Sequence, residues 1–140
     1  MFKVLIIEDC RVTSEIIKLA VEKTLGSNAN VMQAYDLENA INLLDLMSYH
    51  LIFQDICLDS QDSGLKTLEY MFTEKKTDAH VAVCTSYYDR NIVEEFAKWP
   101  VDKYILKPIV TSEIERYVDR VFTKFVSAIM QDEAKESQED

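Results

Sequence analysis

Residues 51–55 are Leu-Ile-Phe-Gln-Asp, an apolar run that stops at a glutamine and an aspartate. A short, nearly continuous apolar run is typical of a strand that is buried on both faces of a parallel sheet. Residues 3–7 (Lys-Val-Leu-Ile-Ile) form a second such run, and it ends in Glu8 and Asp9. We therefore predict two strands that each deliver acidic side chains to one end of a sheet.

Three further short strands are predicted at residues 31–34, 81–84 and 104–106. Segments with apolar residues at helical spacing follow each of the five strands, the last one starting near Thr111. Strict alternation of strands and helices predicts an α/β fold, with a doubly wound, five-stranded parallel sheet and helices on both faces.

Details of the first two helices can also be predicted. Val12, Ile16, Leu19, Ala20 and Lys23 fall at helical spacing, which predicts that they share one face of the first helix. Gly26 stands where a helix end favours a residue that can adopt a positive φ. Asp36 is expected to cap the second helix.

Composition excludes several classes of protein. The chain has 140 residues, 48% of them hydrophobic, which suits one domain with a core, and no apolar run approaches the roughly 18 residues of a membrane span. The net charge of −10 argues against binding to nucleic acid or to an anionic membrane. Three widely spaced cysteines argue against a disulfide scaffold or a zinc site and favour a cytoplasmic protein.

Polar side chains stand at the ends of the predicted strands. Glu8 and Asp9 end the first, Asp55 the third, Thr85 the fourth and Lys107 the fifth. Ligands of open α/β sheets bind outside the carboxyl ends of the strands, so we expect these residues to converge. Three close carboxylates repel one another unless a cation neutralises them, and a hard, oxygen-ligated ion such as Mg²⁺ suits them. With such an ion bound, one carboxylate could attack a phosphoryl group.

Four stretches together resemble the receiver domains of bacterial response regulators. They are Val-Leu-Ile-Ile-Glu-Asp at 4–9, Leu-Ile-Phe-Gln-Asp at 51–55, Thr85-Ser86, and Tyr-Ile-Leu-Lys-Pro at 104–108. The resemblance extends over about residues 2–122 and implies a flavodoxin-like fold. It also implies a phosphoprotein of a two-component or phosphorelay pathway, which takes a phosphoryl group as an aspartyl phosphate and switches its binding to a partner.

The resemblance assigns a role to each matching position. Asp55 matches the phosphoacceptor, and the ligands of Mg²⁺ or Mn²⁺ would be Glu8, Asp9, Asp55 and the backbone carbonyl of Cys57. The phosphoryl-binding and switch residues would be Thr85, Ser86, Lys107 and Tyr104.

This sequence departs from the family pattern at two places. Asp59 stands where the family has proline, and Gly64 arrives one residue late, which indicates an insertion in the loop after the phosphoacceptor. Trp99-Pro100-Val101 replaces a small Gly-Ala turn before the last strand. Both places lie where partners dock, so we expect Trp99 to belong to an interaction surface.

A strand-end aspartate beside a cation also occurs in a different class of protein. Phosphatases of the haloacid dehalogenase type need a second aspartate two residues after the nucleophile, where this chain has Cys57. We therefore expect no enzyme, beyond catalysis of the chain's own phosphorylation and dephosphorylation. Two alternatives stay open: a receiver-like interaction module that works without phosphate, and a receiver fragment of a longer regulator.

The C-terminal residues exceed what a receiver fold requires. We assign residues 1–122 to the receiver domain and residues 123–140 to an extension of the last helix and an acidic, disordered tail. Phe125 and Ile129 continue the apolar stripe and are predicted to form a docking surface for a second copy of the chain or for an output partner. The expected partners are a sensor histidine kinase or a phosphotransfer protein, and a downstream protein.

Overall fold

The computed structural model describes residues 1–56, 58, 63–86 and 90–139. Within that part the strands are β1 (Phe2–Ile7), β2 (Ala29–Ala34), β3 (Leu51–Asp55), β4 (His80–Thr85) and β5 (Lys103–Leu106). The helices are α1 (Arg11–Leu25), α2 (Leu37–Leu46), α3 (Ser63–Glu69), α4 (Arg90–Phe96) and α5 (Thr111–Glu139), with short turns η1 (Gly26–Asn28) and η2 (Tyr70–Glu74).

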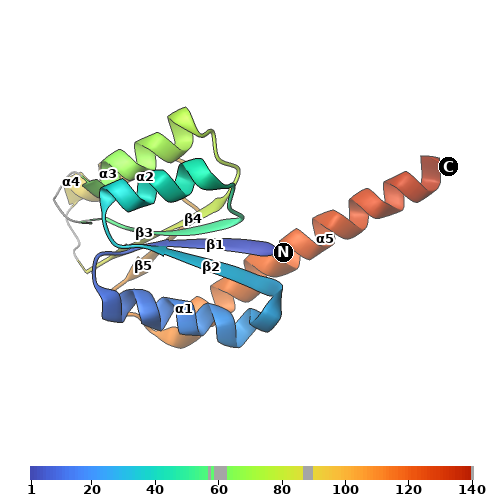
Figure 1. Ribbon diagram of the computed structural model, residues 1–140, viewed down its shortest axis with the longest axis horizontal. Coiled ribbons are helices and arrows are strands. Elements are labelled where there is room, and N and C mark those ends of the chain that lie inside the picture. The colour runs from blue at the N-terminus through green and yellow to red at the C-terminus, as the bar shows by residue number, and fades with distance from the viewer. Residues whose placement is uncertain (57, 59–62, 87–89, 140) are drawn as a thin grey trace.

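The strands form one sheet in the order β2-β1-β3-β4-β5, and every neighbouring pair is parallel. Helices α1 and α5 cover one face of this sheet, and α2 and α3 cover the other (Figure 1). The predicted fold class, a doubly wound five-stranded parallel sheet, is confirmed.

Each face of the sheet has its own hydrophobic core. Alternate residues of a strand point to opposite faces, so Phe53 joins the core under α1 and α5, whereas Ile52 joins the core under α2 and α3. The same alternation places Asp55 on the side of Phe53 and Gln54 on the side of Ile52. The phosphoacceptor candidate and its neighbour in sequence therefore lie in different surroundings.

The buried face of α1 differs from the prediction. Of the predicted stripe Ala20 is buried, but Val12 and Leu19 are 69% and 57% exposed, and the other buried apolar positions are Ile17, Val21 and Leu25. This second stripe also has helical spacing, and it extends to the end of the helix. Apolar periodicity alone does not decide which of two stripes meets the sheet and α5, and the predicted stripe was wrong at Val12 and Leu19.

The predicted helix ends of this region are confirmed. Asp36 precedes α2, and its side chain accepts a hydrogen bond from the backbone N–H of Asn39 at 2.8 Å. Gly26 ends α1 with a φ of 55°, a conformation that costs glycine less than any other residue.

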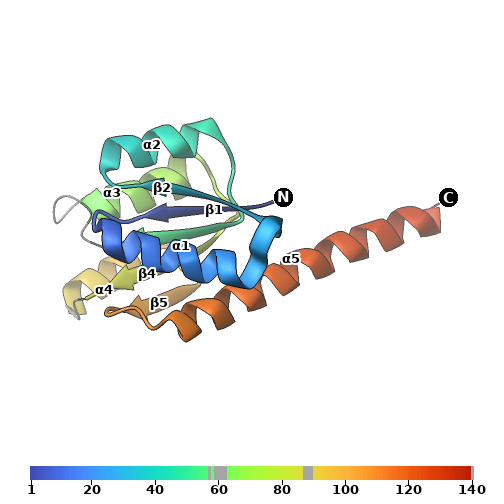
Figure 2. The ribbon, with the colours of Figure 1, turned by 60° about the horizontal axis from the view of Figure 1, so that its bottom comes forward.

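Helix α5 is much longer than the sheet and projects from the body of the protein (Figures 1 and 2). A disordered tail was predicted from Gln131 onward, but the structure continues the helix to Glu139. The segment contains neither glycine nor proline and is rich in good helix formers such as Ala134, Lys135 and Glu136. Of the helices described, none combines the length and the apolar character that a bilayer span requires.

The sequence suggested that Phe125 lies free in solvent, but the structure shows it partly buried. Its ring contacts those of Phe2 and His50, with centroids 5.2 Å and 4.6 Å away, and it is partly buried against the first core. Ile129, one turn further, is 41% exposed. The body of the chain itself therefore covers Phe125, and only Ile129 keeps the exposure that was expected of a docking surface.

Phe125→Ala is accordingly expected to lower the free energy of unfolding by about 2 kcal/mol, because it removes a partly buried ring from a packed cluster. Ile129→Ala, the matched control in the same helix, should change it by less than about 0.5 kcal/mol. Urea unfolding followed by circular dichroism measures both. Equal effects of the two substitutions would contradict the packing described for Phe125.

Candidate functional site

The polar residues that were predicted to converge do so at the carboxyl ends of the strands. Glu8 follows β1, Asp55 ends β3, Thr85 ends β4 and Lys107 follows β5. Glu8 and Asp55 are buried, with only 2% and 5% of their surface exposed, while Asp9 is exposed. The site thus has a buried side at Glu8 and Asp55 and an open side at Asp9.

Three carboxylates form the centre of the site. One oxygen from each of Glu8, Asp9 and Asp55 lies within 4.8 Å of the other two. In the described part of the chain, this is the cluster of Asp, Glu, His or Cys side chains whose ligand atoms lie close enough together to hold a metal ion.

Lys107 supplies the positive charge next to two of these carboxylates. Its Nζ donates to Glu8 Oε1 at 2.5 Å and to Asp55 Oδ1 at 3.4 Å. Its backbone N–H donates to the carbonyl of Thr85 at 2.7 Å, which fixes the start of the loop after β5. Burial lowers the pKa of Lys107, but the hydrogen bond to Glu8 and the charge of Asp55 outweigh it, so the pKa rises. The ammonium group therefore stays charged.

One ammonium group does not balance three carboxylates. Burial, followed by the hydrogen bond and charge of Glu8, raises the pKa of Asp55 from its ordinary value of 3.8 to about 7. Burial and the neighbouring Asp55 also raise the pKa of Asp9. Near neutral pH the Asp55 carboxyl is thus partly protonated, and a divalent cation would displace this proton.

The residues present fit a hard divalent cation. All three side chains offer oxygen, which Mg²⁺ and Mn²⁺ prefer. Glu8 Oε2 is buried and has no hydrogen-bond partner among the described residues, although a buried carboxylate oxygen normally has one. An ion bound beside it would satisfy this atom. Cys57, whose carbonyl was predicted as a further ligand, lies outside the described residues, as does Asp59.

The remaining predicted residues occupy different surroundings. Ser86 follows β4 and is exposed, and Tyr104 lies on β5 with 38% of its surface exposed. Trp99 is partly buried and stacks on Phe72, with ring centroids 6.0 Å apart and planes 7° apart. The structure therefore gives Trp99 a packing role that the sequence did not indicate.

Two residues at the site were not recognised in advance. Gln54 is fully buried beside Asp55, and Gly64 packs so closely on the loop start that a Cβ would collide with the carbonyls of Asp55 and Ile56. A glutamine inside an apolar strand was a visible signal for the first. The sequence indicated only that Gly64 comes one residue late relative to the family pattern. The close approach of its Cα to the carbonyls of Asp55 and Ile56 explains why this position needs a glycine.

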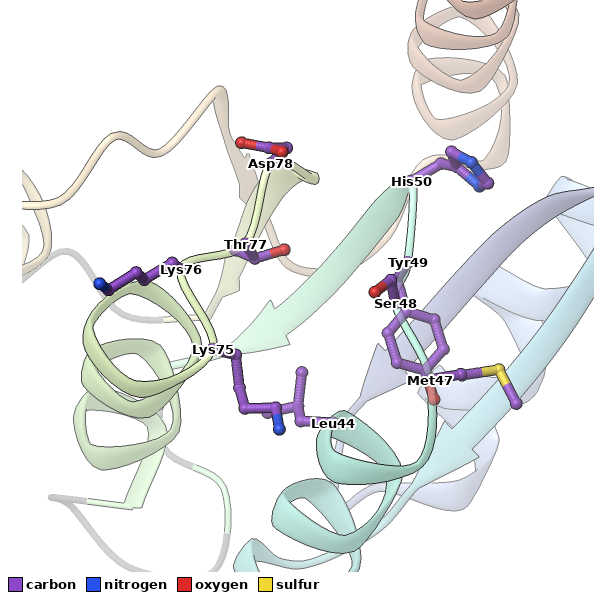
Figure 3. A pocket seen from close by; sticks show the side chains of 9 residues that line it. All are labelled: Leu44, Met47, Ser48, Tyr49, His50, Lys75, Lys76, Thr77 and Asp78. Atoms are coloured by element: carbon purple, nitrogen blue, oxygen red, sulfur yellow. The ribbon is translucent and has the colours of Figure 1, made fainter.

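A pocket in the described part of the chain lies away from this site. It has a volume of about 300 Å³ and lies where β3 begins, at the opposite end from Asp55, among residues that include Tyr49, His50, Lys75 and Asp78 (Figure 3). It contains none of the predicted site residues. The candidate site is therefore identified by its cluster of carboxylates and not by a pocket.

The fold and the strand-end carboxylates define a doubly wound α/β protein with a candidate cation site. Comparison with protein families matches residues 4–119 to the response regulator receiver domain. The match extends over most of the chain, and the chain belongs to this family: it is a receiver domain of two-component signalling.

Solved structures of similar proteins agree with this assignment. A response regulator from Thermotoga maritima is 25% identical, with a TM-score of 0.73 over 88% of this chain and 98% of its own. A signal receiver domain of two-component signal transduction (histidine kinase) from Clostridium thermocellum is 25% identical, with a TM-score of 0.76 over 86% and 96%.

A response regulator from Burkholderia pseudomallei, whose structure contains a phosphorylated aspartic acid, a calcium ion and citrate, shares the fold. It is 23% identical, with a TM-score of 0.71 over 97% of this chain and 75% of its own. The comparison with curated proteins found no match.

Proposed function

We propose that this chain accepts a phosphoryl group on Asp55, with Mg²⁺ or Mn²⁺ bound by Glu8, Asp9 and Asp55, and that the phosphoryl group switches its binding to a partner protein. The observation that carries the proposal is the buried Glu8 Oε2, which lacks a hydrogen-bond partner among the described residues and belongs to a cluster of three carboxylates. A cation would balance the cluster and leave an oxygen of Asp55 able to react.

The residues of the site suit attack by a carboxylate on phosphorus. An oxygen of Asp55 would form the new bond to phosphorus while the bond to the donor's leaving group breaks and that group keeps the electron pair. The ammonium group of Lys107, 3.4 Å from Asp55 Oδ1, would offset charge on the transferred oxygens, and the Thr85 hydroxyl could donate to one of them. The divalent cation, when bound, neutralises phosphoryl and carboxylate charge.

The proposed donor is the phosphohistidine of a sensor histidine kinase or of a phosphotransfer protein. Among proteins of this fold, the response regulator from Burkholderia pseudomallei contains a phosphorylated aspartic acid with a calcium ion. The chain's own catalysis would be limited to gain and loss of its phosphoryl group. A cytoplasmic location stays a prediction from the cysteine content.

The proposed switch works through Thr85, Ser86 and Tyr104. A phosphoryl group adds roughly 1.5–2 negative charges at pH 7. Movement of Thr85 toward it would leave room for Tyr104, which is now partly exposed, to turn inward. That change would alter the surface of α4, β5 and α5, where a downstream protein or a second copy of the chain would bind.

Incubation with acetyl phosphate and Mg²⁺ is expected to add one acid-stable, base-labile phosphoryl group. Asp55→Asn should abolish it, because an amide cannot form an acyl phosphate. Asp45→Asn, in an exposed position on α2, is the control and should label as the parent does. Intact-protein mass spectrometry gives the count. A parent protein that binds Mg²⁺ but never gains phosphate would instead favour the interaction module that works without phosphorylation.

A further inference from the structure

Gln54 is the polar exception inside β3. The strand residues before it, Leu51, Ile52 and Phe53, are apolar, and Gln54 is as fully buried as they are. Its neighbours across the sheet are Ile7 on β1 and Val83 on β4. An apolar side chain would suit this position better, because burial of a polar group without full hydrogen bonding is unfavourable.

Only one end of the Gln54 amide is paired within the described part of the chain. Its Nε2 donates to the backbone carbonyl of Asp55 at 2.8 Å. Its Oε1 is buried and has no hydrogen-bond partner among the described residues. The side chain therefore directs its hydrogen bond to the phosphoacceptor's own main chain, and packing of the core does not explain its presence.

The carbonyl of Asp55 points away from the strand that its own peptide N–H contacts. The N–H of Ile56 donates to Cys84 on β4 at 3.2 Å. In a planar trans peptide the carbonyl points the opposite way, so the carbonyl of Asp55 faces β1. The register of β1 with β3 ends at Ile7 and Gln54, one residue before Asp55, and the Gln54 side chain donates to the carbonyl at this point.

Helix α3 approaches the same peptide group. Gly64 lies so close to the carbonyls of Asp55 and Ile56 that a Cβ would collide with both. The Asp55–Ile56 peptide is thus held by β4 through its N–H and by Gln54 through its carbonyl, with α3 packed against it. A shift of this peptide would carry the Cα of Asp55 with it, and would move the carboxylate relative to Lys107, Glu8 and Asp9.

We propose that Gln54 is a positioning residue for the phosphoacceptor: its side-chain amide holds the carbonyl of Asp55 and thereby fixes the direction of the carboxylate. The inference rests on the function proposed above. It deepens that function, because it assigns a buried residue outside the carboxylate cluster a part in the reaction. Displacement of a reacting group by about 1 Å can lower a rate about 100-fold.

Gln54→Met tests the proposal in the full chain, because methionine keeps the length and loses the donor. Phosphorylation by acetyl phosphate at saturating Mg²⁺ is expected to slow about tenfold or more. The dissociation constant for Mg²⁺, measured by NMR titration, should rise several-fold. The thermal unfolding midpoint without metal should change little, because the substitution removes the unpaired acceptor Oε1 but also the donor to the carbonyl of Asp55, and the two effects oppose each other.

Thr67→Val is the matched control. Thr67 is also fully buried, but its hydroxyl donates to the carbonyl of Ser63 within α3, at 2.7 Å. This variant should have a lower unfolding midpoint, with a phosphorylation rate and a Mg²⁺ affinity within about twofold of the parent.

Two results would overturn the proposal. One is a Gln54→Met protein whose rate and Mg²⁺ affinity both stay within twofold of the parent. The other is a loss of rate that is accompanied by a loss of stability, as large as that of Thr67→Val. If the parent itself takes no phosphate, the proposed function fails, and the Mg²⁺ affinity of Gln54→Met against the parent still decides the role of Gln54.

Discussion

Lys107→Met is expected to lower the free energy of unfolding of the metal-free protein by about 3 kcal/mol at pH 8, since removal of one partner leaves buried carboxylates uncompensated. Lys107 Nζ contacts both Glu8 and Asp55, and Glu8 is only 2% exposed. Saturating Mg²⁺ should restore part of this loss, because the cation replaces the missing positive charge. Urea unfolding with and without Mg²⁺ measures both effects.

Lys103→Met is the matched control for charge removal. Lys103 pairs with Glu113 at 3.7 Å, and both side chains are partly exposed. An exposed pair contributes about 0–1 kcal/mol, so this variant should remain near the parent and show no special response to Mg²⁺. Equal losses for the two lysine variants would contradict the central position of Lys107.

Asp55→Asn is expected to stabilise the metal-free protein at pH 8. The pKa of Asp55 is raised from 3.8 to about 7 in the folded protein, chiefly by burial and then by Glu8. The folded state therefore binds this proton more tightly than the unfolded state. Its contribution to stability is fully present below about pH 3.8 and is lost as the pH rises through 7.

The amide introduced by Asp55→Asn never ionises, so the variant escapes that loss. At about 1.4 kcal/mol per tenfold change in proton affinity, the gain at pH 8 has a ceiling of about 4 kcal/mol. We expect about 2 kcal/mol at pH 8, shrinking toward zero near pH 4, in thermal or urea unfolding of the metal-free proteins. A difference that grows as the pH falls would contradict the raised pKa.

The site could be predicted from the sequence because its chemistry stands at strand ends. Apolar runs stop directly at Glu8 and at Asp55, and the carboxyl ends of parallel strands must share an edge. That rule brings residues 47 positions apart into one cluster without knowledge of any contact, and it does the same for Lys107.

The orientation of α1 could not be predicted in this way. Both Val12-Ile16-Leu19 and Ile17-Val21-Leu25 have helical spacing, and the choice between them depends on how the helix meets the sheet and α5. The same reason applies to Phe125, whose cover comes from Phe2 and His50, residues far away in the sequence. Long-range packing decides both.

The hydrogen-bond partners of individual polar groups also could not be predicted from the sequence. Gln54 could be recognised as unusual in an apolar strand, but its bond to the carbonyl of Asp55 depends on where β1 stops pairing with β3. The lack of a partner for Glu8 Oε2 among the described residues likewise follows from the three-dimensional cluster.

The most direct test of the central claim is to locate the phosphoryl group. After incubation with acetyl phosphate and Mg²⁺, hydride reduction converts an aspartyl phosphate to homoserine, which sequencing of peptides by mass spectrometry can place. The account predicts homoserine at position 55, and its absence when Mg²⁺ is removed by a chelator. Phosphate found on another residue, or homoserine at another aspartate with Asp55 unmodified, would contradict it.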